Sequence, residues 1–133
     1  MYSMKETCEK VGMTYETLKY YCNEGLIPNV KRDKNNYRIF DDNNIAWIKS
    51  LTCLKKCNMS IEEMKQYLAL CLNGESTIPE RQVIIAEKKK QLLKEMSDLQ
   101  ESLDFLNWKE TFYNDVLSGK IKYFSNLINV DEK

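Results

Sequence analysis

The chain has 133 residues, of which 43% are hydrophobic and 30% are charged, and its formal net charge is zero. This length allows one small core with an appended element, and the composition is too polar for a membrane span. No basic start leads into an apolar run, which speaks against a secretory signal, and the odd number of cysteines indicates reduced thiols. We therefore expect a cytoplasmic protein.

Charge is unevenly distributed along the chain. Residues 1–60 hold ten Lys and Arg against seven Asp and Glu, a net charge of +3, and residues 61–133 carry the compensating −3. Five of the cations fall within twenty residues: Lys19, Lys31, Arg32, Lys34 and Arg38. We expect a local basic patch, and a generally basic protein is excluded.

Two short helices are predicted at the start of the chain. Ser3 and Glu6 have the spacing of a capping box, and Gly12 is suited to end the helix about two turns later. Thr14 can cap a second helix, for which Gly25 is the left-handed terminator. Because the two helices are joined by a short turn, they form a helix-turn-helix candidate.

A hairpin is expected next. Val30 and residues 37–40 resemble short strands, and the polar residues 33–36 lie between them. Two of these four residues are asparagines, which tolerate positive φ better than any residue except glycine. The segment therefore predicts a two-stranded hairpin.

Two further helices complete a head that we assign to residues 1–72. Asp41 or Asp42 can cap the first, and Ser60 opens the second with another capping box. Apolar residues form a stripe at helical spacing on the first of them: Ile45, Trp47, Ile48, Leu51 and Leu54.

A different pattern follows a linker at residues 73–79. Leucine and other apolar residues recur with a period of seven, and the predicted seam consists of Ile85, Leu92, Met96, Leu99, Leu103 and Leu106. Lys89 also falls on this seam. A helix over residues 80–117 is too long for the head to cover, so we expect a homodimer. Apolar spacing in the tail, residues 118–133, is compatible with a short docking helix.

Tyrosines and cations on the second helix and the hairpin point to nucleic acid. Both elements present hydrogen-bond donors that could straddle a DNA groove and its phosphates. The residues predicted to contact DNA are Thr14, Tyr15, Thr17, Lys19, Tyr20, Arg32, Lys34, Tyr37 and Arg38. For Tyr20, a place in the core of the head remains an alternative.

Four motifs in order resemble the DNA-binding head of the MerR family of transcription regulators. They are T-x-x-T-L-[RK]-Y-Y at residues 14–21, G-L-[IL]-P at 25–28, Tyr-Arg-x-[FY] at 37–40 and S-[IL]-E-E-[IM] at 60–64. The resemblance implies a mainly α fold, with a winged helix-turn-helix head, a small β-hairpin wing and a long antiparallel coiled-coil dimerisation helix. It also implies double-stranded promoter DNA and RNA polymerase as partners, and no cofactor. Lys19, Cys22 and Asn36 depart from the residues usual at their positions, where the family has Arg, Glu and Gly.

The cysteines bear on the effector that the resemblance implies. The chain has no histidine and no cysteine beyond Cys71, so the usual metal site of the family is missing. The region around Cys53 is similar to the AdhR/NmlR-like branch, in which a cysteine at this position is implicated in sensing aldehydes or nitrosative stress. Lys49 and Lys56 are placed to stabilise a thiolate there, and the alternative is an inert packing residue.

Three classes of function were weighed. A DNA-binding regulator accounts for the head, the hairpin and the long helix together. A thiol-dependent enzyme would lack a histidine base, and an interaction module would leave the basic hairpin unexplained. Within the first class, a drug-like effector bound between head and coiled coil, with Cys53 structural, is the alternative to thiol sensing.

Overall fold

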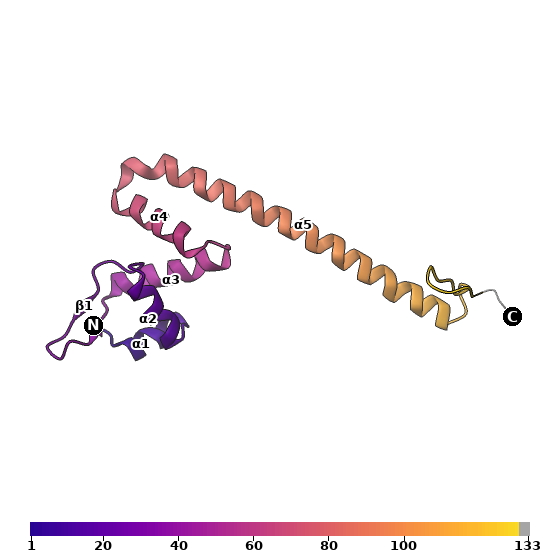
Figure 1. Ribbon diagram of the computed structural model, residues 1–133, viewed down its shortest axis with the longest axis horizontal. Helices are drawn as coiled ribbons and strands as arrows, with labels where there is room; N and C mark the ends of the chain where they lie inside the picture. Colours follow the sequence, from indigo (N-terminus) through magenta and orange to yellow (C-terminus); the bar gives the residue numbers. More distant parts are fainter. Residues whose placement is uncertain (131–133) are drawn as a thin grey trace. The chain divides into compact units, whose positions relative to one another are not determined.

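The computed structural model describes residues 1–130, and two short helices open the chain as predicted. Helix α1 spans Met4–Val11 and helix α2 spans Tyr15–Asn23 (Figure 1). Ser3 caps α1 through a capping box with Glu6. The Ser3 hydroxyl accepts the Glu6 backbone N–H, and the Ser3 backbone N–H donates to the Glu6 carboxylate. Gly12 ends α1 at a φ of 70°, a left-handed conformation that glycine adopts without steric cost.

The expected hairpin follows α2. Strand β1 (Lys31–Arg32) pairs antiparallel with strand β2 (Arg38–Ile39). Asn36 takes a φ of 65° in the turn, and the Asp33 carboxylate accepts two backbone N–H groups of the same turn. Val30, which we expected within the first strand, lies one residue before β1. Backbone hydrogen bonds from Asp33 to the Tyr37 carbonyl and from Asn36 to the Asp33 carbonyl, each 2.9 Å long, also close the turn.

Helix α3 (Asp42–Lys56) and helix α4 (Ile61–Leu72) complete the head. Asp41 is the residue that caps α3, and Ser60 forms the predicted capping box on α4. Asn58 adopts a φ of 65° between the two helices, so that it reverses the chain in the way a glycine would.

One hydrophobic core holds the four helices and the hairpin together. Trp47 stands at its edge, and its indole N–H donates to the Leu26 carbonyl at 2.8 Å. The buried apolar residues of the core are Val11, Leu18, Tyr21, Leu26, Ile27, Phe40, Ile45, Ile48, Leu51, Met59 and Met64. The α3 stripe predicted from helical spacing is therefore confirmed, with Trp47 and Leu54 half-buried against its buried members.

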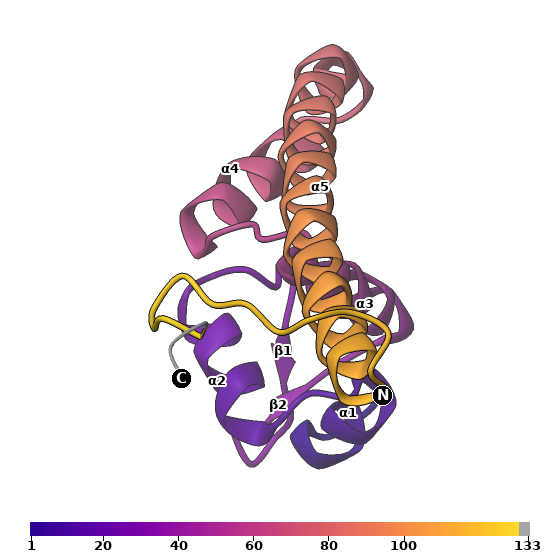
Figure 2. The ribbon, with the colours of Figure 1, turned by 90° about the vertical axis from the view of Figure 1, so that its right-hand side faces the viewer.

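The start of the chain is attached to the wing. Tyr2 and Phe40 form an isolated antiparallel bridge, with N–H···O distances of 2.7 and 2.8 Å. This bridge places the start of α1 beside the hairpin, and Figure 2 shows α1, α2 and the two strands together at one end of the view.

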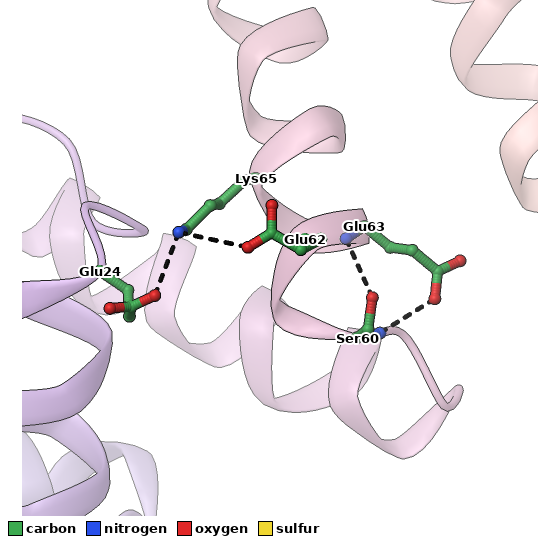
Figure 3. A network of polar contacts seen from close by, with 5 residues as sticks. All are labelled: Glu24, Ser60, Glu62, Glu63 and Lys65. Atoms are coloured by element: carbon green, nitrogen blue, oxygen red, sulfur yellow. Dashed lines mark hydrogen bonds and ion pairs between the residues drawn. The ribbon is translucent and has the colours of Figure 1, made fainter.

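Polar contacts join α4 to two other helices. The Lys65 ammonium lies 3.0 Å from a Glu24 carboxylate oxygen at the end of α2, and Figure 3 shows this contact beside the Ser60 capping box. Glu63, the reciprocal member of that box, also lies 2.7 Å from the Lys88 ammonium on the long helix. Lys65 and Glu63 therefore connect α4 to the end of the helix-turn-helix and to the start of the next element.

Helix α5 (Ile78–Leu117) is a single helix of 40 residues, preceded by a 3-10 turn at Glu75–Thr77. It begins two residues before the expected start, and the predicted linker is correspondingly shorter. Pro79 is tolerated there because the first turn of a helix leaves its backbone N–H groups without intrahelical partners. Two compact units divide within α5, the first ending at Lys90. Within residues 1–130, none of the helices combines the length and the apolar character needed to cross a membrane.

The tail does not form the short docking helix expected in residues 118–133. Turns and bends occupy residues 118–130, and residues 131–133 lie outside the described part of the chain. Gly119 reverses the chain at a φ of 82°, and the Phe124 ring then meets Phe112 edge-on at 4.7 Å. A short helix in the tail would be marginal unless tertiary contacts stabilised it. The tail instead reverses at Gly119 and contacts α5 through Phe124.

Candidate nucleic-acid interface

Three of the predicted contact residues project from α2. Tyr15 and Tyr20 are 54% and 47% exposed, and Lys19 between them is also exposed. The buried face of the same helix is formed by Leu18 and Tyr21. Leu18 and Tyr21 occupy the sector of the helix that faces the core, and the exposed residues lie outside that sector, so the amphipathic pattern separates core from exposed side chains. The alternative of a core position for Tyr20 is wrong.

The two threonines of α2 are engaged in its N-terminal cap. Thr14 Oγ1 accepts the Thr17 backbone N–H at 3.2 Å and donates to Thr17 Oγ1 at 2.9 Å. Both hydroxyls therefore fix the entry of the helix. Their direct contact with DNA stays a prediction.

The wing carries two arginines that are held by hydrogen bonds. The Arg32 guanidinium donates to the Asn36 carbonyl at 2.9 Å, and the Arg38 guanidinium donates to Asn23 Oδ1 at 2.8 Å. The second bond fixes the wing against the end of α2. Because an arginine has five N–H donors, each retains donors for a phosphate. Tyr37, 70% exposed, and the exposed Lys34 extend beyond them.

A pocket of about 460 Å³ opens between the helix-turn-helix and the wing. Tyr15, Arg32, Tyr37 and Arg38 line it, so the structure brings together predicted contacts from α2 and the hairpin. Lys5 also lines this pocket and was missed by the sequence analysis. Its position follows from the bridge between the start of the chain and the wing, a non-local pairing that no local pattern announces.

A second pocket, of about 450 Å³, lies between α2, the end of α3 and the start of α4. Its polar wall consists of Glu16, Thr17, Lys55 and Ser60, and Tyr21 contributes a ring that is only 2% exposed. Among the described residues the Tyr21 hydroxyl has no hydrogen-bond partner, and burial raises the pKa of this phenol. The group therefore stays protonated and able to donate. Neither Tyr21 nor Lys55 was among the residues predicted to contact DNA.

Cys53 and the residues of the predicted seam lie outside these pockets. The Cys53 side chain is exposed on α3, whereas Cys8, Cys22, Cys57 and Cys71 are half-buried. Burial is the main cause that raises the pKa of the Cys8 and Cys22 thiols. On α5, five of the six seam residues are exposed and Leu92 is half-buried.

A helix-turn-helix with a cationic wing and a long appended helix defines a winged helix-turn-helix regulator. Comparison with known proteins gives the family: residues 2–71 match the model of the MerR HTH family of regulatory proteins. The chain belongs to the MerR family, and it is a transcriptional regulator rather than an enzyme.

Relatives match over most of the chain. An uncharacterized HTH-type regulator of Haemophilus influenzae is 35% identical over 122 residues, covering 91% of this chain and 90% of that protein. AdhR of Bacillus subtilis is 33% identical over 91 residues, or 68% of this chain and 65% of AdhR.

Solved structures show the same fold. HiNmlR, described as a MerR family regulator that lacks the sensor domain and is bound to promoter DNA, has a TM-score of 0.75 and 33% identity, with 88% of this chain and 93% of that chain covered. A MerR regulator of Listeria monocytogenes has a TM-score of 0.80 and 31% identity, over 90% and 91% of the two chains.

Proposed function

We propose that the chain acts as a homodimer that binds a promoter through α2 and the wing and controls its transcription by RNA polymerase in response to an effector. The observation that carries the proposal is the pocket that joins Tyr15 of α2 to Arg32 and Arg38 of the wing. The structural relative HiNmlR is bound to promoter DNA, which supports the same use of this surface.

The exposed face of α2 is proposed to read the major groove. Tyr15 and Lys19 project from the first turns of the helix, the part of a recognition helix that contacts base edges. The wing then follows the phosphate backbone, with Arg38 and Tyr37 as its contacts. Lys5 in the lining of the pocket and Lys34 in the turn of the hairpin add positive charge for contacts with phosphates.

The second pocket is proposed to hold a phosphate further along the same backbone. Within residues 1–130 the buried, protonated Tyr21 hydroxyl has no partner, and Lys55 contributes a cation to the lining of the same pocket, which also contains the Glu16 carboxylate. A phosphate oxygen placed there would satisfy the hydroxyl, which otherwise carries the cost of a lost hydrogen bond.

The wing contact can be tested by salt titration. Arg38→Ala removes one cation from the backbone contact, so the slope of log affinity against log salt should fall by about 0.9 for one phosphate lost. Fluorescence anisotropy with the protein's own promoter DNA measures this slope, and Lys94→Ala on α5 is the control. An unchanged slope in Arg38→Ala would remove the wing from the interface.

Dimerisation is proposed to use the exposed seam of α5. Leu99 and Met96 are 69% and 65% exposed, and apolar side chains repeated every seven residues need a partner helix to cover them. An antiparallel arrangement gives a two-fold dimer whose symmetry matches a two-fold operator.

The effector is proposed to be an electrophile such as an aldehyde or a nitrosating species, sensed at Cys53. The exposed thiol supports access, and the similarity to AdhR supports the branch. Cys53→Ser should keep promoter binding and abolish induction by aldehyde in a reporter strain, whereas Cys57→Ser should retain most of the response. Normal induction in Cys53→Ser would favour the alternative, a drug-like ligand between head and coiled coil.

A further inference from the structure

An aromatic cluster lies where α5 ends and the tail begins. Phe112 is its centre and is 7% exposed, which makes it the buried residue of α5. Trp108 stacks on Phe112 at 5.4 Å with an interplanar angle of 8°, and Phe124 meets it edge-on. Tyr113 and Tyr123 lie 5.6 and 6.3 Å from the same ring. These rings come from both the helix and the tail.

The cluster encloses a pocket of about 390 Å³. Small-molecule sites have volumes of roughly 300 to 1,000 Å³ and walls that are mostly apolar or aromatic, with a few polar groups. This pocket fits that description, because six aromatic residues and a leucine accompany its polar groups. None of the residues proposed to contact DNA takes part in it.

Lys109 supplies the positive charge of the pocket. Its ammonium lies 5.5 to 5.7 Å from the ring centroids of Phe105, Trp108 and Tyr113, within the range of cation–π attraction. Among the ion pairs of residues 1–130, none involves Lys109. The wall of the pocket therefore contains a cation that lies near three aromatic rings and that forms no ion pair within residues 1–130.

We propose that this pocket binds a small anion with a flat aromatic body, of the class of the aromatic carboxylates. The ring system would lie against the aromatic side chains, and the carboxylate would pair with Lys109. A cationic ligand is disfavoured because it would meet Lys109, and a neutral one would leave that charge unpaired. A second copy of the chain is a less suitable occupant of the pocket. The pocket is a hollow lined by both α5 and the tail, which suits a small molecule better than a helix surface.

Calorimetry with the full chain and three probes of one shape tests the charge of the ligand. The probes are 1-naphthoate, the neutral 1-naphthamide and the cationic 1-naphthylmethylammonium. We expect 1-naphthoate to bind at one site per chain. Its affinity should be about tenfold higher than that of the amide, because a charge-assisted contact raises affinity by about a factor of ten. The ammonium probe should bind most weakly.

Two variants connect this binding to the pocket. Lys109→Gln should weaken 1-naphthoate binding by about tenfold and bring it level with the amide, while Lys94→Gln on the same helix should change neither. Phe124→Ala removes part of the wall and should weaken all three probes. Circular dichroism establishes that each variant keeps its helix content.

Two results would overturn the proposal. Equal affinity for the three probes, or no binding of 1-naphthoate at millimolar concentration, would remove the charge argument. Binding to a monomeric Leu99→Asp variant but not to the unaltered protein would show that a second copy covers the pocket. Each of these outcomes is independent of promoter binding, which is followed separately by anisotropy.

Discussion

Single residues of the head combine core packing with exposed chemistry. Tyr21 is the clearest case, because its ring is buried among the core residues while its hydroxyl has no partner within residues 1–130. Helical spacing predicts the buried face, but it cannot tell whether the far end of a long side chain reaches a pocket. The role of Tyr21 therefore depends on α4 and the end of α3, which are distant in the sequence.

Tyr21→Phe should separate stability from DNA binding. Removing a buried hydroxyl without a partner should leave the free energy of unfolding unchanged or raise it by about 1 kcal/mol. The same change should weaken promoter binding about tenfold, because it removes a donor to a phosphate. Urea denaturation and anisotropy measure the two effects, with Tyr2→Phe as a control outside the pocket. Loss of stability together with unchanged affinity would contradict this role.

The thiols should differ in their reaction with iodoacetamide. Burial raises the pKa of Cys8 and Cys22 above the ordinary 9.0, so at neutral pH each has a smaller thiolate fraction than a free thiol. Cys53, which is exposed, should therefore be alkylated first, and the rates at the half-buried Cys8 and Cys22 should rise only at higher pH. Peptide mass spectrometry after timed alkylation at pH 7 and pH 9.5 gives the order, and modification of Cys22 before Cys53 would refute it.

At the scale of elements, local rules predict boundaries and non-local packing decides the rest. Ser3, Asp41 and Ser60 cap helices where the sequence predicts, because a cap depends on residues within one turn. The position of Lys5 beside the wing and the path of the tail depend on contacts between distant segments, so neither follows from periodicity. For this reason the sequence predicted α2 and the wing as parts of the site. It did not predict the two pockets beside them, because these depend on contacts between distant segments.

The ion pair between Glu63 and Lys88 predicts a pH dependence of stability. The hydrogen bond from Lys88 is the largest cause that lowers the pKa of Glu63 below its ordinary value of 4.5. A carboxyl whose folded pKa is lowered stabilises the fold above the unfolded pKa, and this contribution is lost as pH falls through the folded value.

Glu63→Gln should therefore lower Tm at pH 7 and have little effect well below pH 4, where the carboxylate is protonated in both states. Thermal unfolding of the two proteins across this range measures the difference. Glu62→Gln, on the same turn but more exposed, is the matched control. A difference in Tm that stayed constant down to low pH would exclude the ion pair as its cause.

At the scale of the whole molecule, α5 is too exposed to be explained by a single chain. Its seam residues are mostly exposed, and a sustained heptad pattern over a surface helix indicates a partner. The sequence predicts this helix to within two residues at its start because heptad periodicity is a local signal. What it could not predict is the aromatic cluster at the other end, where the tail folds onto α5 through Phe124.

Leu99→Asp tests the seam. The substitution would bury a carboxylate in each chain of the dimer, so it should shift the protein to monomer in sedimentation equilibrium. Ser97→Asp adds the same charge on the opposite face of α5 and should leave the dimer intact. An undisturbed dimer in Leu99→Asp would show that another surface joins the chains.

The length of the unbroken helix α5 would also determine the spacing of the DNA-binding heads. In an antiparallel dimer, the distance between the two heads would be set in steps of about 1.5 Å per residue. Seven extra residues inserted at the centre of the seam would keep the apolar face in phase and separate the heads by about 10 Å. That is the rise of about three base pairs, which also turns the DNA by roughly a third of its helical repeat. A promoter with half-sites moved apart by three base pairs would therefore match the lengthened protein in distance but not in phase.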